Sequence, residues 1–262
     1  MTSIKNYNKA GEAVITKEVI VNNLTKMGLG LNNIIEVHSS LSSFGIVDGG
    51  APIVVDALME IVGPKGTIIM SAYPMSPPIP LTKKEKTQGI KWKVKRLDLK
   101  SNEKTGMGTI SDEFKSRKDV YLGTNLHRVA AWGKSAKKHS GGYRYFLELD
   151  GLVLLIGVGI DRCSSLHLAE NDTPIPQEIK NYEKIPSNIL KNYPKDEWSI
   201  GFGETPHDAW QKVFSVADQK GLIQHHKIGS AKCLLFKAND VAEILKKWRS
   251  SDPYGLYGIK RI

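Results

Sequence analysis

The chain has 262 residues, of which 40% are hydrophobic and 24% charged, and this composition excludes a disordered protein. Its 37 Lys and Arg exceed its 27 Asp and Glu, so an anionic partner has to be weighed against a plain lysine-rich surface. There is no apolar run long enough to span a membrane and no signal-peptide core, and the chain has two cysteines. We therefore expect one domain over residues 1–262, in a reducing cytoplasm and without membrane contact.

The first third of the chain predicts a strand–loop–helix–strand unit. After a helix capped by Thr16, residues 34–38 form a short apolar run, and a Ser- and Gly-rich loop follows over residues 39–50. Helical spacing of apolar residues then continues to Val62, and residues 66–72 read as a second buried strand. Such a unit favours a parallel strand pair, so we predict an α/β fold with a mixed, partly parallel central sheet flanked by helices.

The rest of the chain alternates loops with short elements. Residues 73–106 show no periodicity, and nine Lys or Arg stand against three acidic residues between Lys83 and Lys104, so we expect a long irregular connection there. Residues 172–200 are also predicted to be loop-rich. The further predicted elements are helices over residues 107–117 and 133–139, a strand over 129–132, a helix starting at Thr205-Pro206, strand-like pieces over 222–236, and a final helix capped by Asn239.

The stretch Gly151–Glu170 carries the strongest indication of chemistry. Its apolar run predicts a buried strand, and Gly157 and Gly159 allow a sharp turn before a first helical turn capped by a serine. His167 and Glu170 are three residues apart, so on a helix their side chains share one face. A histidine oriented by a carboxylate past a strand end is typical of a general base, although structural pairs of this kind also occur.

Two glycine-containing turns are candidate anion sites. The turn over residues 39–50 leads from a strand into a helix, and backbone N–H groups at such a helix start favour a phosphate as much as a plain polar turn. Gly106 and Gly108 open the next helix and permit close approach of a ligand. The turn over residues 39–50 is not a Walker loop, because it lacks the Gly-Lys-Ser/Thr sequence.

Several of these stretches together resemble the aminoglycoside 3-N-acetyltransferases, a family of antibiotic-resistance enzymes. The resemblance implies an acetyl-CoA-dependent acetyltransferase that modifies the 3-amino group of the deoxystreptamine ring. The matching stretches, in family order, are VHSSLSSFGIVDGG (37–50), MGTISDEF (107–114), HRVAAWG (127–133), Gly157-Val158-Gly159 with SLHLAE (165–170), and IGSA (228–231).

The resemblance implies which residues hold the pyrophosphate and pantetheine arm of coenzyme A. Thr105, Gly108 and Thr109 at the next helix start are added as candidates because of the glycines there. The chain departs from the family at Arg128, where a cofactor-contacting serine is usual, so this arginine either contacts a cofactor phosphate or faces solvent. The residues carried over are His38, Ser39, Ser40, Ser42, Val47, Gly49 and Gly50.

Acyl transfer to an amine requires a base and a donor to the oxyanion. We assign the base to His167, oriented by Glu170, and the oxyanion donors to the amides of Ser39–Ser42 or to the Thr109 hydroxyl. A nucleophilic Cys163 is an alternative, but packing is the commoner fate of a free cysteine. No metal is expected, because the histidines lack metal-ligand spacing.

Charge along the chain predicts where the acceptor amine binds. Residues 170–208 hold eight acidic residues and four lysines, so Asp172, Glu178 and Glu183 are predicted to bind a cationic amino sugar, with coenzyme A held by the basic stretch Lys83–Lys104. A different small amine stays an alternative acceptor. A nucleic-acid-binding protein is disfavoured, because no zinc-finger, RNP or homeodomain pattern is present. A homodimer is left open.

Overall fold

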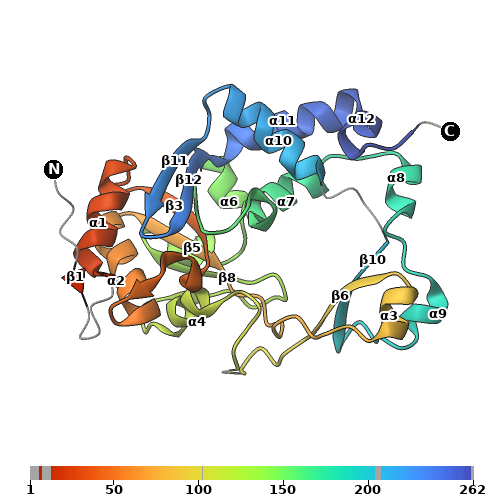
Figure 1. Cartoon of the computed structure of the whole chain (residues 1–262), viewed down its shortest axis with the longest axis horizontal. Helices are drawn as coiled ribbons and strands as arrows, with labels where there is room; N and C mark the ends of the chain where they lie inside the picture. Colours follow the sequence, from red (N-terminus) through yellow and green to blue (C-terminus); the bar gives the residue numbers. More distant parts are fainter. Residues whose placement is uncertain (1–5, 8–12, 102, 204–207, 261–262) are drawn as a thin grey trace.

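The computed structural model describes residues 6–7, 13–101, 103–203 and 208–260, and is built around a seven-stranded sheet (Figure 1). Its strands are β3 Ile34–Ser39, β5 Thr67–Ser71, β7 Tyr121–Leu122, β8 Val129–Gly133, β9 Leu152–Ile156, β11 Gln224–Ile228 and β12 Ala231–Lys237. They lie in the order β11-β12-β9-β3-β5-β8-β7. β9, β3 and β5 run parallel at the centre, and each outer strand is antiparallel to its inner neighbour. The predicted mixed, partly parallel sheet is confirmed.

Both faces of the central strands are buried. Val153 and Leu155 of β9 face one hydrophobic core, whereas Leu154 and Ile156 face the other, and all four are fully buried. Successive side chains of a strand point to opposite faces, so a continuous apolar run indicates a strand covered on both sides. This is why the predicted buried strand before Gly157 is confirmed.

Two groups of helices form the covering layers (Figure 1). One face is covered by α1 Lys17–Lys26, α2 Gly50–Val62 and α4 Thr109–Ser116, and the other by α6 Arg144–Glu148, α7 Ser164–Asn171, α10 Asp208–Gln219 and α11 Ala238–Ser251. The remaining short elements are strands β1 Asn6–Tyr7, β2 Ala13–Ile15 and β4 Ile46–Val47, the 3-10 helices η1 Leu41–Phe44 and η2 Ile160–Arg162, and helices α5 Ala136–His139 and α12 Pro253–Tyr257.

The two regions predicted to be irregular instead form a second, small sheet. β6 Ile90–Lys95 pairs antiparallel with β10 Trp198–Phe202, and the helices α3 Lys83–Thr87, α8 Gln177–Asn181 and α9 Ser187–Leu190 lie around them, apart from the large sheet (Figure 1). Lys93 of β6 donates to Glu85 at 2.6 Å. The prediction of a long irregular connection was wrong, because the partner strand lies about a hundred residues away in sequence and gives no local signal.

The helix starts were predicted with mixed success. Thr16 caps α1 as expected, and its hydroxyl accepts from the Val19 amide. No serine caps α7, which begins after Cys163. Asn239 lies inside α11, and its side-chain amide donates to the Leu147 carbonyl. The start predicted at residues 205–206 lies outside the described residues. Among the described helices, none is both long and apolar enough to cross a membrane.

A buried histidine makes the fold sensitive to acid. His139 of α5 is fully buried against Tyr145, and neither ring nitrogen has a hydrogen-bond partner. Burial, with a smaller contribution from Lys138, lowers the pKa of His139 to about 4, whereas an exposed histidine titrates near pH ~6.5. The unfolded chain therefore binds this proton first, and the native state loses stability as the pH falls through this interval.

We expect His139→Phe to remove that loss. The free energy of unfolding of the wild type should fall by about 2 to 3 kcal/mol more than that of the variant between pH 7.5 and 4.5, as measured by urea unfolding. His127→Phe, at an exposed histidine, is the control and should behave as the wild type. Parallel pH curves for wild type and His139→Phe would contradict this role of His139.

Candidate active site

The candidate site lies at the carboxyl ends of the three parallel strands. Ser39, Ser71 and Ile156 end β3, β5 and β9, and parallel strands present their carboxyl ends at one edge of the sheet. Ligands of open α/β sheets bind at this edge. The Ser71 hydroxyl contacts Tyr143 at 2.6 Å and the Ser164 hydroxyl at 2.8 Å, so a polar network links this edge to the start of α7.

His167 and Glu170 lie together on α7, as predicted. The Nδ1 atom of His167 is 3.2 Å from Glu170 Oε2, and its Nε2 atom is 2.9 Å from the Asp161 carbonyl oxygen. The ring packs edge-on against Trp210 of α10. A carbonyl and an ionised carboxylate only accept hydrogen bonds, so both ring nitrogens carry a proton in this arrangement. To act as a base, His167 has to lose the Nε2 proton and its bond to Asp161.

The surroundings of His167 shift its pKa upwards. Burial opposes the charged ring, but the hydrogen bonds to Glu170 and to the Asp161 carbonyl outweigh burial, so the pKa of His167 is raised above its ordinary value. Burial likewise opposes the ionised Glu170, yet hydrogen bonds from His167 and Tyr257 lower the pKa of this carboxyl overall. Both shifts favour the charged forms of the two partners, an imidazolium beside a carboxylate.

Two residues near the C-terminus hold Glu170, and the sequence did not single them out. Tyr257 of α12 donates its hydroxyl to Glu170 Oε1 at 2.8 Å, and the Arg249 guanidinium of α11 lies 3.2 Å from the same oxygen. Arg249 is 5% exposed and lies over the Tyr257 ring. An arginine on the apolar face of a predicted amphipathic helix is the signal that could have revealed it, because a buried charge requires a partner.

A second buried carboxylate connects the serine turn with α7. Glu36 is fully buried in β3, and its oxygens lie 2.6 Å from His38 Nε2, 3.1 Å from the Ser165 amide and 3.7 Å from the Cys163 sulfur. The Ser164 amide also points at His38 Nε2, at 3.3 Å. His38 is therefore fixed between β3 and the first turn of α7, close to the helix that carries His167.

The serine turn is more ordered than a plain polar loop. Ser39 still belongs to β3, and the Ser40 amide donates to the Ile156 carbonyl at 2.9 Å, so that amide is not available to an oxyanion. The Ser40 and Ser42 hydroxyls lie 3.1 Å apart. Val47 belongs to the short strand β4, which pairs with β2.

The predicted glycines stand at helix starts. Gly49 and Gly50 open α2 with φ of 83° and 65°, and a Cβ on Gly50 would meet nothing within 4 Å, so the backbone is open to a ligand there. Gly108 precedes α4, and a Cβ on it would lie 3.7 Å from the Ser39 carbonyl oxygen. The structure thus brings the start of α4, with Thr109, beside the serine turn. Thr105 is buried and bonded to Asp112 through its amide and hydroxyl.

Arg128 takes a position that sequence analysis did not foresee. It is 4% exposed, its Nε donates to the Ala72 carbonyl at 2.8 Å, and another guanidinium nitrogen donates to the Leu99 carbonyl at 2.7 Å. The alternative that Arg128 faces solvent was therefore wrong. Burial also lowers its pKa. Its observed contacts fix the chain after β5, and a cofactor contact stays a prediction.

Cys163 contributes a buried thiol beside Glu36. Burial, together with the nearby Glu36 charge, raises the pKa of Cys163 well above its ordinary value, which disfavours the thiolate that a nucleophile requires. Glu36, His38 and Cys163 are also a group within the described ranges whose ligand atoms lie close enough for a metal ion. The three side chains hydrogen-bond within the cluster instead, and sequence spacing did not reveal this grouping.

Two of the three carboxylates predicted to bind the acceptor have partners within the chain. Asp172 forms a two-point contact with Arg144, at 3.1 and 3.2 Å, and Glu178 accepts from the Tyr254 hydroxyl at 3.3 Å. Glu183 follows α8 and is exposed. A role of these residues in binding the acceptor stays a prediction.

The predicted separation of a basic side from an acidic side was wrong. The basic stretch forms α3 and β6, the acidic stretch forms α8, α9 and β10, and β6 and β10 pair in one sheet. Lys93 and Lys95 lie over the Trp198 ring of β10. The pairing of β6 with β10 therefore brings the two stretches side by side.

Comparisons with known proteins agree with this architecture. Residues 37–250 match the model of the aminoglycoside 3-N-acetyltransferases. YokD of Bacillus subtilis, an SPbeta prophage-derived aminoglycoside N(3′)-acetyltransferase-like protein, is 27% identical over 89% of this chain and 92% of its own length. Aminoglycoside N(3)-acetyltransferase III of Acinetobacter baumannii is 25% identical over 86% of this chain and 88% of its own.

Solved structures show the same fold. A histidine-to-alanine variant of aminoglycoside acetyltransferase AAC(3)-IVa, in complex with a gentamicin, superposes with a TM-score of 0.70 at 20% identity, over 94% of this chain and 92% of that one. A binary complex of AAC-IIIb with CoASH superposes with a TM-score of 0.65 at 17% identity, over 95% of this chain and all of that one. The chain therefore belongs to the aminoglycoside 3-N-acetyltransferase family, an acyltransferase family.

Proposed function

We propose that the protein transfers the acetyl group of acetyl-CoA to the 3-amino group of the deoxystreptamine ring of an aminoglycoside. The observation that carries this proposal is the His167–Glu170 pair at the carboxyl edge of the sheet, in a chain that belongs to this family. Support for the substrates comes from relatives that are bound to CoASH and to a gentamicin.

In the proposed reaction His167 is the general base. The neutral ring keeps its Nδ1 proton toward Glu170 and presents Nε2 to the acceptor amine. The amine nitrogen forms a bond to the thioester carbon as Nε2 takes its proton, and the carbon–sulfur bond then breaks. Glu170 holds the ring and stabilises the imidazolium that forms, and Arg249 and Tyr257 hold Glu170.

The oxyanion of the tetrahedral intermediate needs donors at the same edge. Because the Ser40 amide is bonded to Ile156, the candidates kept from the turn are the Leu41 and Ser42 amides, together with the Thr109 hydroxyl at the start of α4. A helix start adds positive potential there. In this proposal His38, Ser39 and the open backbone at Gly50 contact the pantetheine arm.

One observation favours the alternative of a different small amine as acceptor. The net charge is +10, and Asp172 and Glu178 already have partners within the chain. Thiol release from acetyl-CoA, measured over a panel of aminoglycosides and of neutral and anionic amines, decides between the two. Turnover of an aminoglycoside supports the first acceptor class, and turnover confined to neutral or anionic amines excludes it.

We expect His167→Ala to lower kcat by about 10²–10⁴-fold, because it removes the base. Coenzyme A affinity, measured by calorimetry, should stay unchanged. Glu170→Gln should lose part of the rate through misorientation of the ring, whereas Glu243→Gln, which removes a surface carboxylate paired with Lys246, should have no effect. Turnover of His167→Ala at the wild-type rate would exclude the base assignment.

The pH profile tests the surroundings of His167. Because the base must be neutral and its pKa is raised, kcat/KM should fall on the acid side with a midpoint above the ordinary histidine value of about 6.5. In Glu170→Gln the midpoint should move to lower pH, since burial then opposes the charged ring with less compensation.

Tyr257→Phe should shift the midpoint of the acid limb of kcat/KM in the opposite direction. Without the Tyr257 hydroxyl, Glu170 should interact more strongly with the imidazolium, so the midpoint should move to higher pH with less than about a tenfold loss of rate. Tyr254→Phe, at the neighbouring tyrosine that contacts Glu178, is the matched control. Identical acid limbs in wild type and Tyr257→Phe would show that Tyr257 does not act on His167 through Glu170.

A further inference from the structure

Three side chains of different chemistry meet beside the start of α7. Glu36 and His38 lie on β3, and Cys163 directly precedes α7. One carboxylate oxygen, one imidazole nitrogen and the sulfur atom of these residues all lie within 4.8 Å of one another. Among the described residues, no other set of three histidine, cysteine or acidic side chains lies close enough together to hold a metal ion.

The fold brings these groups together from two segments. Residues two apart on a strand point to the same face of a sheet, so Glu36 and His38 share one side of β3. Their register partners on the parallel strand β9 are Val153 and Leu155, whose side chains belong to the core that α7 covers. After β9 the chain passes through η2 and returns to this core at Cys163. Two of the three groups are therefore fixed at the rigid centre of the large sheet.

The distances within the cluster are close to those that a tetrahedral zinc ion requires. Zinc binds carboxylate oxygen and imidazole nitrogen at about 2.0–2.2 Å and thiolate sulfur at about 2.3 Å, so its ligand atoms lie about 3.3–3.7 Å apart. The Cys163 sulfur is 3.7 Å from Glu36 Oε2, which meets this condition. His38 Nε2 is 2.6 Å from Glu36 Oε1, so these two atoms have to separate by about 1 Å.

His38 is the member of the cluster that can make this movement. Its side chain is 10% exposed, whereas Glu36 and Cys163 are fully buried. An outward rotation of the imidazole both lengthens its distance to Glu36 and opens a path from solvent. An ion therefore enters from the side of His38.

The charges of the three groups match a divalent cation. Metal ligation requires cysteine as a thiolate and histidine as a neutral imidazole. The Glu36 carboxylate and a Cys163 thiolate together carry two negative charges, so one divalent ion leaves the buried cluster without net charge, as buried ionic groups require. Sulfur and imidazole ligands favour zinc, whereas magnesium and calcium prefer oxygen ligands alone.

Groups at the start of α7 hold the two anionic ligands from outside the cluster. The Ser165 amide donates to Glu36 Oε1 at 3.1 Å, and the Ser165 hydroxyl lies 3.3 Å from the Cys163 sulfur. Such outer hydrogen bonds orient metal ligands and contribute to metal affinity. Glu36 and Cys163 are therefore already held close to the positions that ligation needs.

We propose that Glu36, His38 and Cys163 bind a zinc ion, with water in the fourth tetrahedral position. On binding, the Cys163 thiol releases its proton to solvent, and the sulfur, His38 Nε2 and a Glu36 oxygen each donate an electron pair to the ion. Bonds to the metal replace the hydrogen bonds that the three side chains otherwise share. Metal binding at this cluster does not depend on the proposed acetyl transfer.

The test uses cobalt(II) as the first probe, because it occupies tetrahedral zinc sites and gives a charge-transfer absorption when a thiolate binds it. Titration of the reduced wild type should produce this absorption with saturation at one equivalent, and zinc, which binds such ligands more tightly, should displace the cobalt. Cys163→Ser should lose the absorption. Glu36→Gln should bind zinc at least about tenfold more weakly, since the loss of outer partners alone costs about 10–100-fold.

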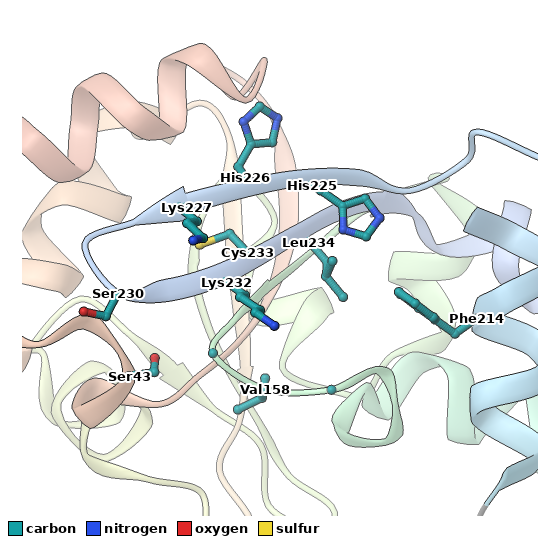
Figure 2. A pocket seen from close by; sticks show the side chains of 12 residues that line it. Ser43, Val158, Phe214, His225, His226, Lys227, Ser230, Lys232, Cys233 and Leu234 are labelled. Carbon is teal, nitrogen blue, oxygen red and sulfur yellow. The ribbon is translucent and has the colours of Figure 1, made fainter. Parts of the chain in front are cut away.

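Cys233→Ser is the matched control, because Cys233 is the other buried free cysteine. It lies on the β11–β12 hairpin, in the wall of a cavity of about 1100 Å³ (Figure 2). This hairpin, residues 224–237, carries Lys227 and Lys232 and holds no acidic residue, so it lacks the carboxylate that Cys163 has beside it. Cys233→Ser should therefore bind cobalt and zinc as the wild type does.

Thermal unfolding gives a second readout that needs no enzymatic activity. A ligand that binds the native state stabilises it, so zinc should raise the Tm of the wild type and of Cys233→Ser but not that of Cys163→Ser. Near-ultraviolet circular dichroism checks that each variant is folded. If Glu36→Gln does not fold, the comparison of the two cysteine variants decides the test.

Two results would overturn the proposal. One is a wild type that shows no charge-transfer absorption with cobalt. The other is absorption that persists in Cys163→Ser, or that is lost in Cys233→Ser, because the metal would then be bound elsewhere in the chain. Zinc affinity in folded Glu36→Gln equal to that of the wild type would likewise exclude the carboxylate as a ligand and contradict the site as proposed.

Discussion

The burial of one carboxylate, Glu36, sets the geometry of the site. A fully buried carboxylate requires hydrogen-bond partners. Glu36 meets this requirement with His38 on its own strand and with Cys163 and the Ser165 amide at the start of α7. The positive end of the helix dipole adds to the compensation. Because His167 lies close to the start of that helix, the position of the proposed general base depends on Glu36.

The second carboxylate, Glu170, connects His167 to the last helices of the chain. It is shared by His167, Tyr257 and Arg249, so α7, α11 and α12 meet around a single negative charge. His167 and Tyr257 donate hydrogen bonds to it and Arg249 contributes a positive charge, and together they lower the pKa of this carboxyl although burial opposes its ionised form. Helices α11 and α12 therefore cover the core and also fix the orientation of the imidazole.

The charged groups that become neighbours in the folded chain differ from those that the order of charges in the sequence indicates. The basic residues 83–104 and the acidic residues 170–208 lie far apart in sequence, yet their strands β6 and β10 pair. Glu85 accepts hydrogen bonds from both Lys93 and Tyr193. Lys227 and Lys232 lack carboxylate partners within the described residues, and their hairpin over residues 224–237 holds no acidic residue. Whether a charged side chain has a partner depends on its neighbours in the folded structure, since electrostatic interaction depends on distance in space.

The resemblance of several motifs predicted the family. Local patterns in the chain were sufficient to predict the central strands, most helix positions and the His167–Glu170 pair. These features depend on continuous apolar runs, on helical spacing and on residues three apart on one face. The small sheet, the burial of Arg128, and the partners Glu36, Arg249 and Tyr257 of the site emerged only from the folded chain. The physical reason is that these contacts join segments that are distant in sequence, such as Glu170 and Tyr257 with a separation of 87. No periodicity or composition encodes which distant groups a buried charge will meet.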